Sequence, residues 1–153
     1  MRLKTVTSSQ MSEALLNPAG IRLDVTASSK EEAVNIAGGL LVEIGAVSPE
    51  YVEAMQVREK AFSSYMGNGV SIPHGTDEAR NWVNFGQLVF LRFKEPVIWD
   101  NEGVVLCIGI AAKADEHGEI LGNLAEALLD EKIVQILQST NNKDEILSIL
   151  LKS

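Results

Sequence analysis

Hydrophobic and polar positions follow two different periods in the first third of the chain. Residues 21–25, IRLDV, alternate between apolar and polar side chains, which is typical of a strand. Apolar side chains then recur at helical spacing over residues 33–44. Ser29 and Glu32 precede this stretch with the spacing of a capping box, and Gly45 follows it where a C-terminal cap is expected. The pattern predicts a strand followed by a helix.

A second helix is predicted to begin shortly after the first one ends. Ser48 is positioned to cap it and Pro49 to occupy its first turn, where proline is tolerated. Apolar and polar side chains within residues 50–62 are stacked at helical spacing, among them Val52 and Glu59, and Arg58 lies near the expected end. We therefore expect Arg58 at the boundary between this helix and the next segment.

The pattern in the rest of the chain, from residue 68 onward, predicts strands and then helices. Residues 68–72 form a short strand that leads to His74, and Thr76 with the two acids after it is typical of a helix start. Residues 85–93 and 104–112 predict two more strands, and the second is almost wholly apolar, as expected for a central strand covered on both faces. From residue 116 a helical period continues through three segments to the end, the last with Asn142 as its cap.

This order of elements predicts an α/β fold. One strand, two helices, three strands and three helices favour a three-layer α/β/α sandwich, with a small mixed β-sheet flanked by helices, because strands joined by short turns are antiparallel. The chain has 153 residues, the size of one domain. We assign residues 1–12 to a polar N-terminal extension and residues 13–153 to a single domain.

Composition and charge narrow the choice of function. We find no apolar run long enough for a membrane span and no secretory signal, so we expect a cytoplasmic protein without direct membrane insertion. Thirteen basic and twenty-one acidic residues give a net charge of −8, without a basic cluster, which argues against a nucleic-acid partner. A protein partner with a basic docking face fits this charge better. The single cysteine, Cys107, lies in an apolar segment and is interpreted as a packing residue.

One of only two histidines stands in a rigid setting, between Pro73 and Gly75. Proline fixes its own backbone, and glycine permits backbone angles or close approaches that a side chain forbids. His74 is therefore expected to have a fixed orientation. A satisfied core or surface residue, a metal ligand, a general base and a covalent nucleophile are all open interpretations of such a histidine.

The surrounding residues weight these alternatives without deciding between them. A metal site lacks support, because the chain has no H-x-x-x-H pattern and no second cysteine. A nucleophilic His74 next to glycine N–H groups is suited to carry a phosphoryl group. Arg58 would offer a fork of donors to phosphoryl oxygens if it folds back, or else form surface ion pairs. His117 would be a second donor, or a capping or surface residue.

Three segments carry a resemblance to a known family: YMGNGVSIPHGTDEAR, PEYVEAMQVREK and VVLCIGIAAKADEHGEIL. They are similar to the mannitol/fructose-type enzyme IIA domains of the bacterial sugar phosphotransferase system, in which the histidine of a P-H-G motif is transiently phosphorylated. The resemblance covers most of the chain and is greatest to the mannitol branch. One departure is that relatives often carry an acidic residue where this chain has Asn68 and Gly69.

The resemblance implies roles for three residues. It makes His74 the phosphoryl acceptor, Arg58 the arginine near the phosphate, and His117 the second histidine of the active site. It also implies that the carrier protein HPr donates the phosphoryl group and that a cysteine of a IIB domain receives it. No metal or organic cofactor is needed for this chemistry.

Other functions remain as alternatives. A nitrogen-type regulatory IIA would use the same His74 chemistry but signal by binding other proteins. A regulatory module that has lost phosphorylation fits less well, because both histidines and Arg58 are retained. A metal hydrolase would require bound metal.

Overall fold

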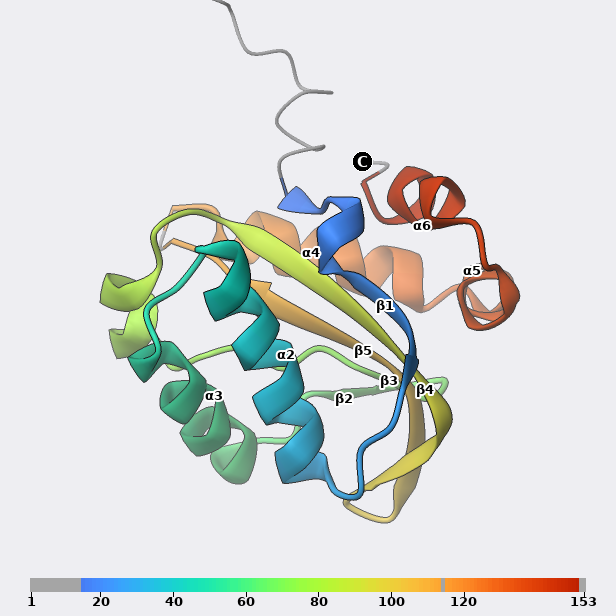
Figure 1. The fold of residues 1–153 in the computed structure, drawn as a ribbon, viewed down its shortest axis with the longest axis horizontal. Helices are drawn as coiled ribbons and strands as arrows, with labels where there is room; N and C mark the ends of the chain where they lie inside the picture. The colour runs from blue at the N-terminus through green and yellow to red at the C-terminus, as the bar shows by residue number, and fades with distance from the viewer. Residues whose placement is uncertain (1–14, 114, 152–153) are drawn as a thin grey trace, which may run out of the picture.

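The computed structural model describes residues 15–113 and 115–151. Figure 1 shows three layers, with a twisted sheet between two groups of helices, as the sequence predicts. The N-terminal extension expected over residues 1–12 lies outside the described residues.

The central sheet is mixed and has the strand order β1-β4-β5-β3-β2. β1 runs parallel to β4, β4 antiparallel to β5, β5 parallel to β3, and β3 antiparallel to β2. The strands are β1 (Ile21–Val25), β2 (Tyr65–Gly67), β3 (Val70–Ser71), β4 (Gln87–Trp99) and β5 (Glu102–Ala111). Because β3 and β5 run in the same direction, their C-terminal ends meet at one edge of the sheet.

The helices cover both faces of this sheet. α2 (Lys30–Ile44) and α3 (Glu50–Ala61) cover one face, and α4 (His117–Leu128), α5 (Glu131–Ser139) and α6 (Lys143–Leu150) cover the other (Figure 1). Two short 3₁₀ helices, η1 (Pro18–Gly20) and η2 (Glu78–Trp82), complete the elements. Among the helices of the described residues, none is both long and apolar enough to cross a membrane.

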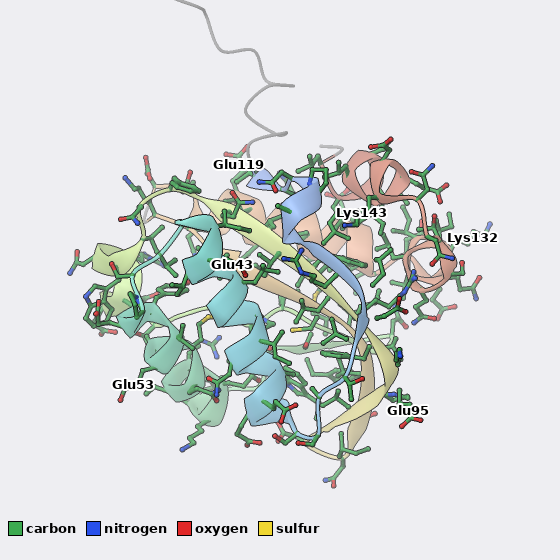
Figure 2. All side chains as sticks on the ribbon, in the orientation of Figure 1. Glu43, Glu53, Glu95, Glu119, Lys132 and Lys143 are labelled. Atoms are coloured by element: carbon green, nitrogen blue, oxygen red, sulfur yellow. The ribbon has the colours of Figure 1, made fainter. Side chains whose placement is uncertain are left out.

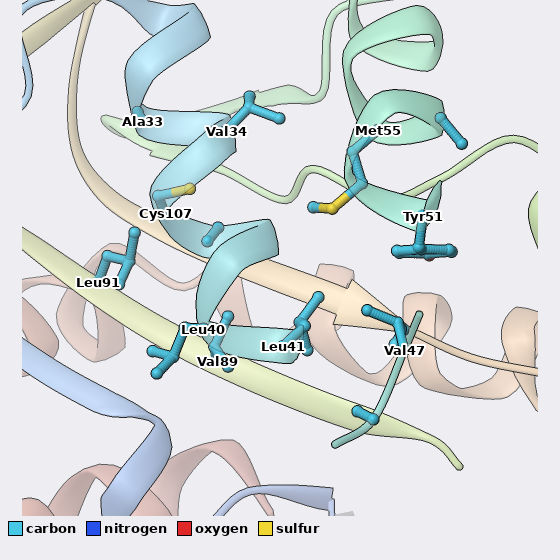
Figure 3. Packing of buried hydrophobic residues seen from close by; sticks show 14 of the residues in the cluster. Ala33, Val34, Leu40, Leu41, Val47, Tyr51, Met55, Val89, Leu91 and Cys107 are labelled. Atoms are coloured by element: carbon cyan, nitrogen blue, oxygen red, sulfur yellow. The ribbon is translucent and has the colours of Figure 1, made fainter. Parts of the chain in front are cut away.

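Side chains from opposite faces of the central strands pack into two separate hydrophobic cores, one on each side of the sheet. Val89 and Leu91 of β4 pack with α2 and α3, whereas Leu88 and Phe90 pack against α4 to α6. β5 divides its side chains in the same way, so the expectation of a strand covered on both faces is confirmed. Figure 3 shows part of the first core, where α2 and α3 meet.

Contact between α2 and α3 explains a glycine in the middle of α2. A Cβ at Gly38 would lie 2.9 Å from a methyl carbon of Val52 and 3.2 Å from the sulfur of Met55. Glycine lowers helix stability, but here it lets α3 approach closely. The position of Arg58 on α3 depends on this packing.

The caps of α2 are confirmed, but the cap predicted for α3 is wrong. The Ser29 hydroxyl accepts the Glu32 N–H at 3.1 Å, and Gly45 ends the helix with a φ of 92°. Ser48 does not cap α3 through its side chain; its carbonyl accepts the Tyr51 N–H at 3.0 Å, and Pro49 is the N-cap. The backbone turn replaces the hydroxyl because Pro49 is already helical, with a φ of −55°.

The strands of the structure differ from the predicted ones in two places. β2 is not predicted, because Tyr65–Gly67 is too short for a visible alternation and is defined by pairing with β3. Residues 94–103, expected as a connection, mostly continue β4 and β5 past an irregularity in their pairing between Arg92 and Val97. Asp100 and Asn101 form the tight turn, with φ values of 49° and 78°, which asparagine and aspartate tolerate better than most residues.

Charged side chains surround the molecule rather than gathering on one element. Figure 2 labels Glu43 on α2, Glu53 on α3, Glu95 on β4 and Glu119 on α4, and all four are exposed. The negative charge predicted from composition is thus distributed over several faces.

Candidate active site

The segment around His74 is attached to the C-terminal edge of the sheet. It directly follows β3, and the Ile110 N–H on β5 donates to the Pro73 carbonyl at 3.0 Å. One residue earlier, the Ile72 N–H donates to the Ser64 carbonyl at 3.1 Å. These bonds hold the backbone on the N-terminal side of His74, so its orientation is set by the sheet.

One nitrogen of the His74 ring forms a hydrogen bond, and the other is free to react. Nδ1 lies 2.9 Å from the Ile72 carbonyl oxygen. A carbonyl only accepts, so Nδ1 carries the hydrogen, and Nε2 of the neutral ring carries the lone pair. The residue is 8% exposed. The result is a shielded imidazole with Nε2 as its only nucleophilic atom.

The fold brings the second histidine next to the first. His117 is the first residue of α4, which follows β5, and its ring centroid lies 5.4 Å from that of His74, with the rings tilted by 59°. The parallel ends of β3 and β5 produce this juxtaposition. Both histidines identified in the sequence therefore lie in one site.

Burial is the main influence on both imidazoles. It lowers the pKa of His74, and the nearby Arg58 charge lowers it further, while the Ile72 hydrogen bond, Glu59 and Asp77 act in the opposite direction. Burial also lowers the pKa of His117, assisted by the charges of Arg80 and His74. A pKa below the ordinary value keeps each ring neutral near pH 7, as a nucleophile requires.

Arg58 lies in the last turn of α3, and its side chain contacts Phe62 just after that helix. Its Nη1 donates to the Phe62 carbonyl at 2.7 Å, and its guanidinium carbon lies 5.3 Å from the centroid of the exposed Phe62 ring. Its charge affects the pKa of both histidines. Of the three residues singled out in the sequence, His74 and His117 lie side by side, and the Arg58 charge acts on the pKa of both.

Comparison with known proteins identifies the family. The family model described as phosphoenolpyruvate-dependent sugar phosphotransferase system, EIIA 2, matches residues 14–153. The chain belongs to that family. A mannitol-specific phosphotransferase enzyme IIA component from Halalkalibacterium halodurans is 43% identical over 140 residues, which are 92% of this chain and 97% of the relative. As a member of the family, this IIA domain is a phosphotransferase component of the sugar phosphotransferase system.

Solved structures agree with this assignment. The enzyme IIAMTL from Escherichia coli, in a complex with phosphorylated enzyme IIBMTL, has a TM-score of 0.84 and 38% identity, covering 91% of this chain and all of that one. The nitrogen regulatory protein IIA-Ntr from Neisseria meningitidis has a TM-score of 0.79 and 30% identity, covering 92% of this chain and 98% of that one.

Glu59, which follows Arg58 in this IIA domain, was not predicted as a site residue. Its side chain is 3% exposed and accepts three hydrogen bonds: from the Ser64 N–H at 2.7 Å, from the Ser64 hydroxyl at 2.5 Å and from the Trp99 indole at 3.1 Å. A buried carboxylate needs such donors. Glu59 therefore ties the end of α3 to β4 and to the segment that holds Ile72. In the sequence it looks like an ordinary polar residue of a helix.

Arg80 is a second arginine whose charge acts on one of the two histidines, and the sequence analysis did not single it out. It lies in η2, and its Nη2 is 3.0 Å from a carboxylate oxygen of Asp77. After burial, its charge is the largest influence on the pKa of His117. The only sequence signal was its place shortly after the P-H-G motif, which does not show where its side chain points.

A metal site and the single cysteine are the remaining candidates for chemistry. Within residues 15–113 and 115–151, no three histidine, cysteine, aspartate or glutamate side chains converge as a metal ion requires. Cys107 is buried, and burial raises the pKa of its thiol to about 12, so it stays protonated and unreactive. Its interpretation as a packing residue agrees with its place in the core (Figure 3).

The lowered imidazole pKa values predict how this IIA domain responds to pH. Unfolded histidines bind protons near pH 6.5, whereas the folded state resists protonation of His74 and His117. The free energy of unfolding should therefore decrease as the pH falls below about 6.5. NMR titration of the two rings should give midpoints below 6.5, accompanied by a lower thermal midpoint at acidic pH. A His74 midpoint at or above 6.5 would contradict this.

Proposed function

We propose that this IIA domain carries a phosphoryl group on Nε2 of His74. It takes the group from phosphohistidine on HPr and passes it to a cysteine of a IIB domain, in the uptake of mannitol or a related sugar. The observation that carries the proposal is the Nδ1 contact to the Ile72 carbonyl, because it leaves Nε2 as the nucleophile of a ring that lies beside His117.

Each transfer is a displacement at phosphorus. The Nε2 lone pair attacks the phosphorus, an N–P bond forms, and the N–P bond of the donor breaks, with its electron pair returning to the donor imidazole. In the second step a cysteine thiolate attacks, an S–P bond forms, and the electron pair of the broken bond returns to Nε2 of His74. The Ile72 carbonyl keeps Nδ1 protonated in both steps.

Two cationic or donor groups would stabilise the charge that develops on the phosphoryl oxygens. Arg58 presents a planar fork of N–H donors, which suits two oxygens at once. His117, with its ring beside His74, supplies a further donor when it carries a proton on the facing nitrogen. Both act on the transferred group and neither needs to form a covalent bond.

Exposed hydrophobic residues on elements near His74 in the sequence suit protein partners. Val57 and Phe62 on and after α3, and Trp82 and Phe85 on and after η2, are exposed large hydrophobic residues. These are the elements that carry Arg58 and follow His74. The net charge of −8 complements a carrier protein with a basic face and would accelerate its encounter.

The relatives support the choice of partner and sugar. The relative from Halalkalibacterium halodurans is named mannitol-specific, and the Escherichia coli structure holds its IIA together with phosphorylated IIB. We propose that this chain also serves mannitol uptake and also has a IIB domain as its partner. We also place the reaction in the cytoplasm, since phosphoenolpyruvate, named in the family description, is a metabolite of that compartment.

A nitrogen-type regulatory role is the alternative. The IIA-Ntr neighbour supports it through its similar fold, but with 30% identity against 38% for the mannitol enzyme. Both functions would use His74, so phosphorylation alone does not separate them. Onward transfer to a mannitol-type IIB domain does, because a purely regulatory protein has no such acceptor.

The deciding experiment supplies phosphoenolpyruvate, enzyme I and HPr to the purified chain and measures its intact mass. The proposal expects a gain of one phosphoryl group, its loss when an unphosphorylated IIB domain is added, and no gain when HPr is omitted. A chain that gains no phosphoryl group under these conditions overturns the proposal. A phosphorylated chain that is not discharged by IIB supports the regulatory alternative.

Replacing His117 should slow transfer without removing the acceptor. In His117→Ala, His74 still becomes phosphorylated, but the rate of transfer to IIB should fall roughly tenfold or more, because one donor to the transition state is lost. Rapid-quench measurement of the discharge rate provides the test. An unchanged rate would show that His117 has no role in transfer and is only a capping or surface residue at the start of α4.

A further inference from the structure

Gly75, immediately after His74, donates its N–H to a tyrosine hydroxyl. Its N–H donates to the hydroxyl oxygen of Tyr51 at 2.9 Å, and that hydroxyl donates to the Ile110 carbonyl at 2.9 Å. His74 and Ile110 form an isolated parallel bridge whose other bond, from Ile110 N–H to Pro73, is direct. The Tyr51 hydroxyl thus links the two backbones on the C-terminal side of His74.

The Tyr51 ring also limits what can occupy position 75. A Cβ added to Gly75 would lie 2.6 Å and 2.8 Å from two ring carbons, which no ordinary contact allows. Gly75 is not among the glycines with positive φ, so the backbone angle does not require glycine here. The sequence left close approach and backbone freedom open, and the structure selects close approach to Tyr51.

Tyr51 is itself held firmly. It is 3% exposed on α3, within the core shared by α2, α3 and the sheet (Figure 3). Burial raises the pKa of its hydroxyl, so the group remains protonated and able to donate near pH 7. Its place on α3 also puts it on the helix whose last turn carries Arg58.

We propose that Tyr51 is a positioning residue for His74: its hydroxyl and ring hold the peptide at Gly75 so that Nδ1 stays on the Ile72 carbonyl and Nε2 stays aimed at the phosphoryl group. Pro73 is fixed by Ile110 and Gly75 by Tyr51, so the imidazole has an anchor on each side. Without the hydroxyl, the Gly75 N–H and the Ile110 carbonyl lose their shared partner, and the neutral ring gains access to its other tautomer.

The test is Tyr51→Phe, which keeps the ring and removes only the hydroxyl. Nitrogen-15 NMR of the unphosphorylated chain, well above pH 6.5, should show a single Nδ1-protonated tautomer of His74 in the wild type and a mixture in the variant. The rate of transfer from HPr should fall roughly tenfold to a hundredfold, the scale expected for misplacing a reacting group, with little change in KM for HPr.

Tyr65→Phe is the matched control. The Tyr65 hydroxyl also accepts a glycine N–H, that of Gly69 at 3.3 Å, but in the β2–β3 turn rather than beside His74. This variant should keep both the tautomer and the rate. Gly75→Ala, which displaces the same peptide by contact with the ring, should mix the tautomers as Tyr51→Phe does.

The outcomes separate this inference from the transfer reaction on which its kinetic part rests. A fixed His74 tautomer in Tyr51→Phe overturns the positioning role, whether or not transfer slows. Mixed tautomers with wild-type transfer overturn it as well. If the wild type accepts no phosphoryl group, the proposed function fails, while a tautomer change confined to Tyr51→Phe and Gly75→Ala still supports Tyr51 as the residue that orients His74.

Discussion

His74→Ala should abolish phosphorylation of the chain by HPr. His74 Nε2 is the proposed acceptor, and an alanine offers no atom that can form the N–P bond. Intact-mass measurement should detect no gain, whereas the wild-type adduct should be labile to acid and stable to base, as expected for phosphohistidine. Because the ring is buried, the variant also loses packing and the bond to Ile72, so its fold must be verified.

His74→Gln is the matched control for folding. A glutamine amide is close in size and retains an N–H that can donate to the Ile72 carbonyl, but its nitrogen has no free lone pair for attack. It should have a thermal midpoint closer to that of the wild type than His74→Ala, and no phosphorylation. If either variant gains the mass of one phosphoryl group, His74 is not the acceptor, and His117, with its ring alongside, becomes the residue to replace next.

Local patterns predicted the secondary structure well where a side chain meets its own neighbours. Ser29 caps α2 through a bond to Glu32, three residues on, and the alternating apolar residues of β5 face the two cores. Pro73 and Gly75 similarly marked His74 as a held residue. Each of these features depends on a few consecutive residues, and the sequence displays them directly.

Features that depend on distant pairing could not be predicted in this way. His117 lies beside His74 because Val70 pairs with Leu106 and Ser71 with Cys107, a register that no local pattern encodes. Glu59 is buried because the Trp99 indole reaches it from β4. Only the family resemblance brought His117 and Arg58 into the same site.

The hairpin of β4 and β5 shows a different limit of prediction from the sequence. Residues 94–103 separate the two strands that the sequence predicts, and they include Pro96, which is unfavourable in a central strand. In the structure the pairing is interrupted between Arg92 and Val97, so Pro96 lies where no ladder bond is required. The strands then resume as far as the turn at Asp100 and Asn101.

Arg58→Lys should fold normally and transfer slowly, and Arg58→Ala should be slower still. The guanidinium is proposed to hold two phosphoryl oxygens with its planar fork, which the point charge of lysine cannot reproduce. Loss of such a group is expected to cost roughly 10² to 10³-fold in transfer rate for alanine. The contact to the exposed Phe62 ring contributes only about 0.5–1 kcal/mol to stability, so the thermal midpoint should change little.

Lys60→Ala supplies the matched control, because Lys60 lies in the same last turn of α3 and its removal changes the net charge by the same amount. It should leave both transfer and the His74 titration as in the wild type. Arg58→Ala removes a charge that lowers the His74 pKa, so the NMR midpoint of that ring should rise. Since the titration is measured without any partner, it tests whether Arg58 acts at the site, while the rate tests what it does there. Normal transfer in Arg58→Ala would remove the residue from the mechanism even if the midpoint moves, because a nearby charge that does not contact the transferred group changes the pKa without stabilising the transition state.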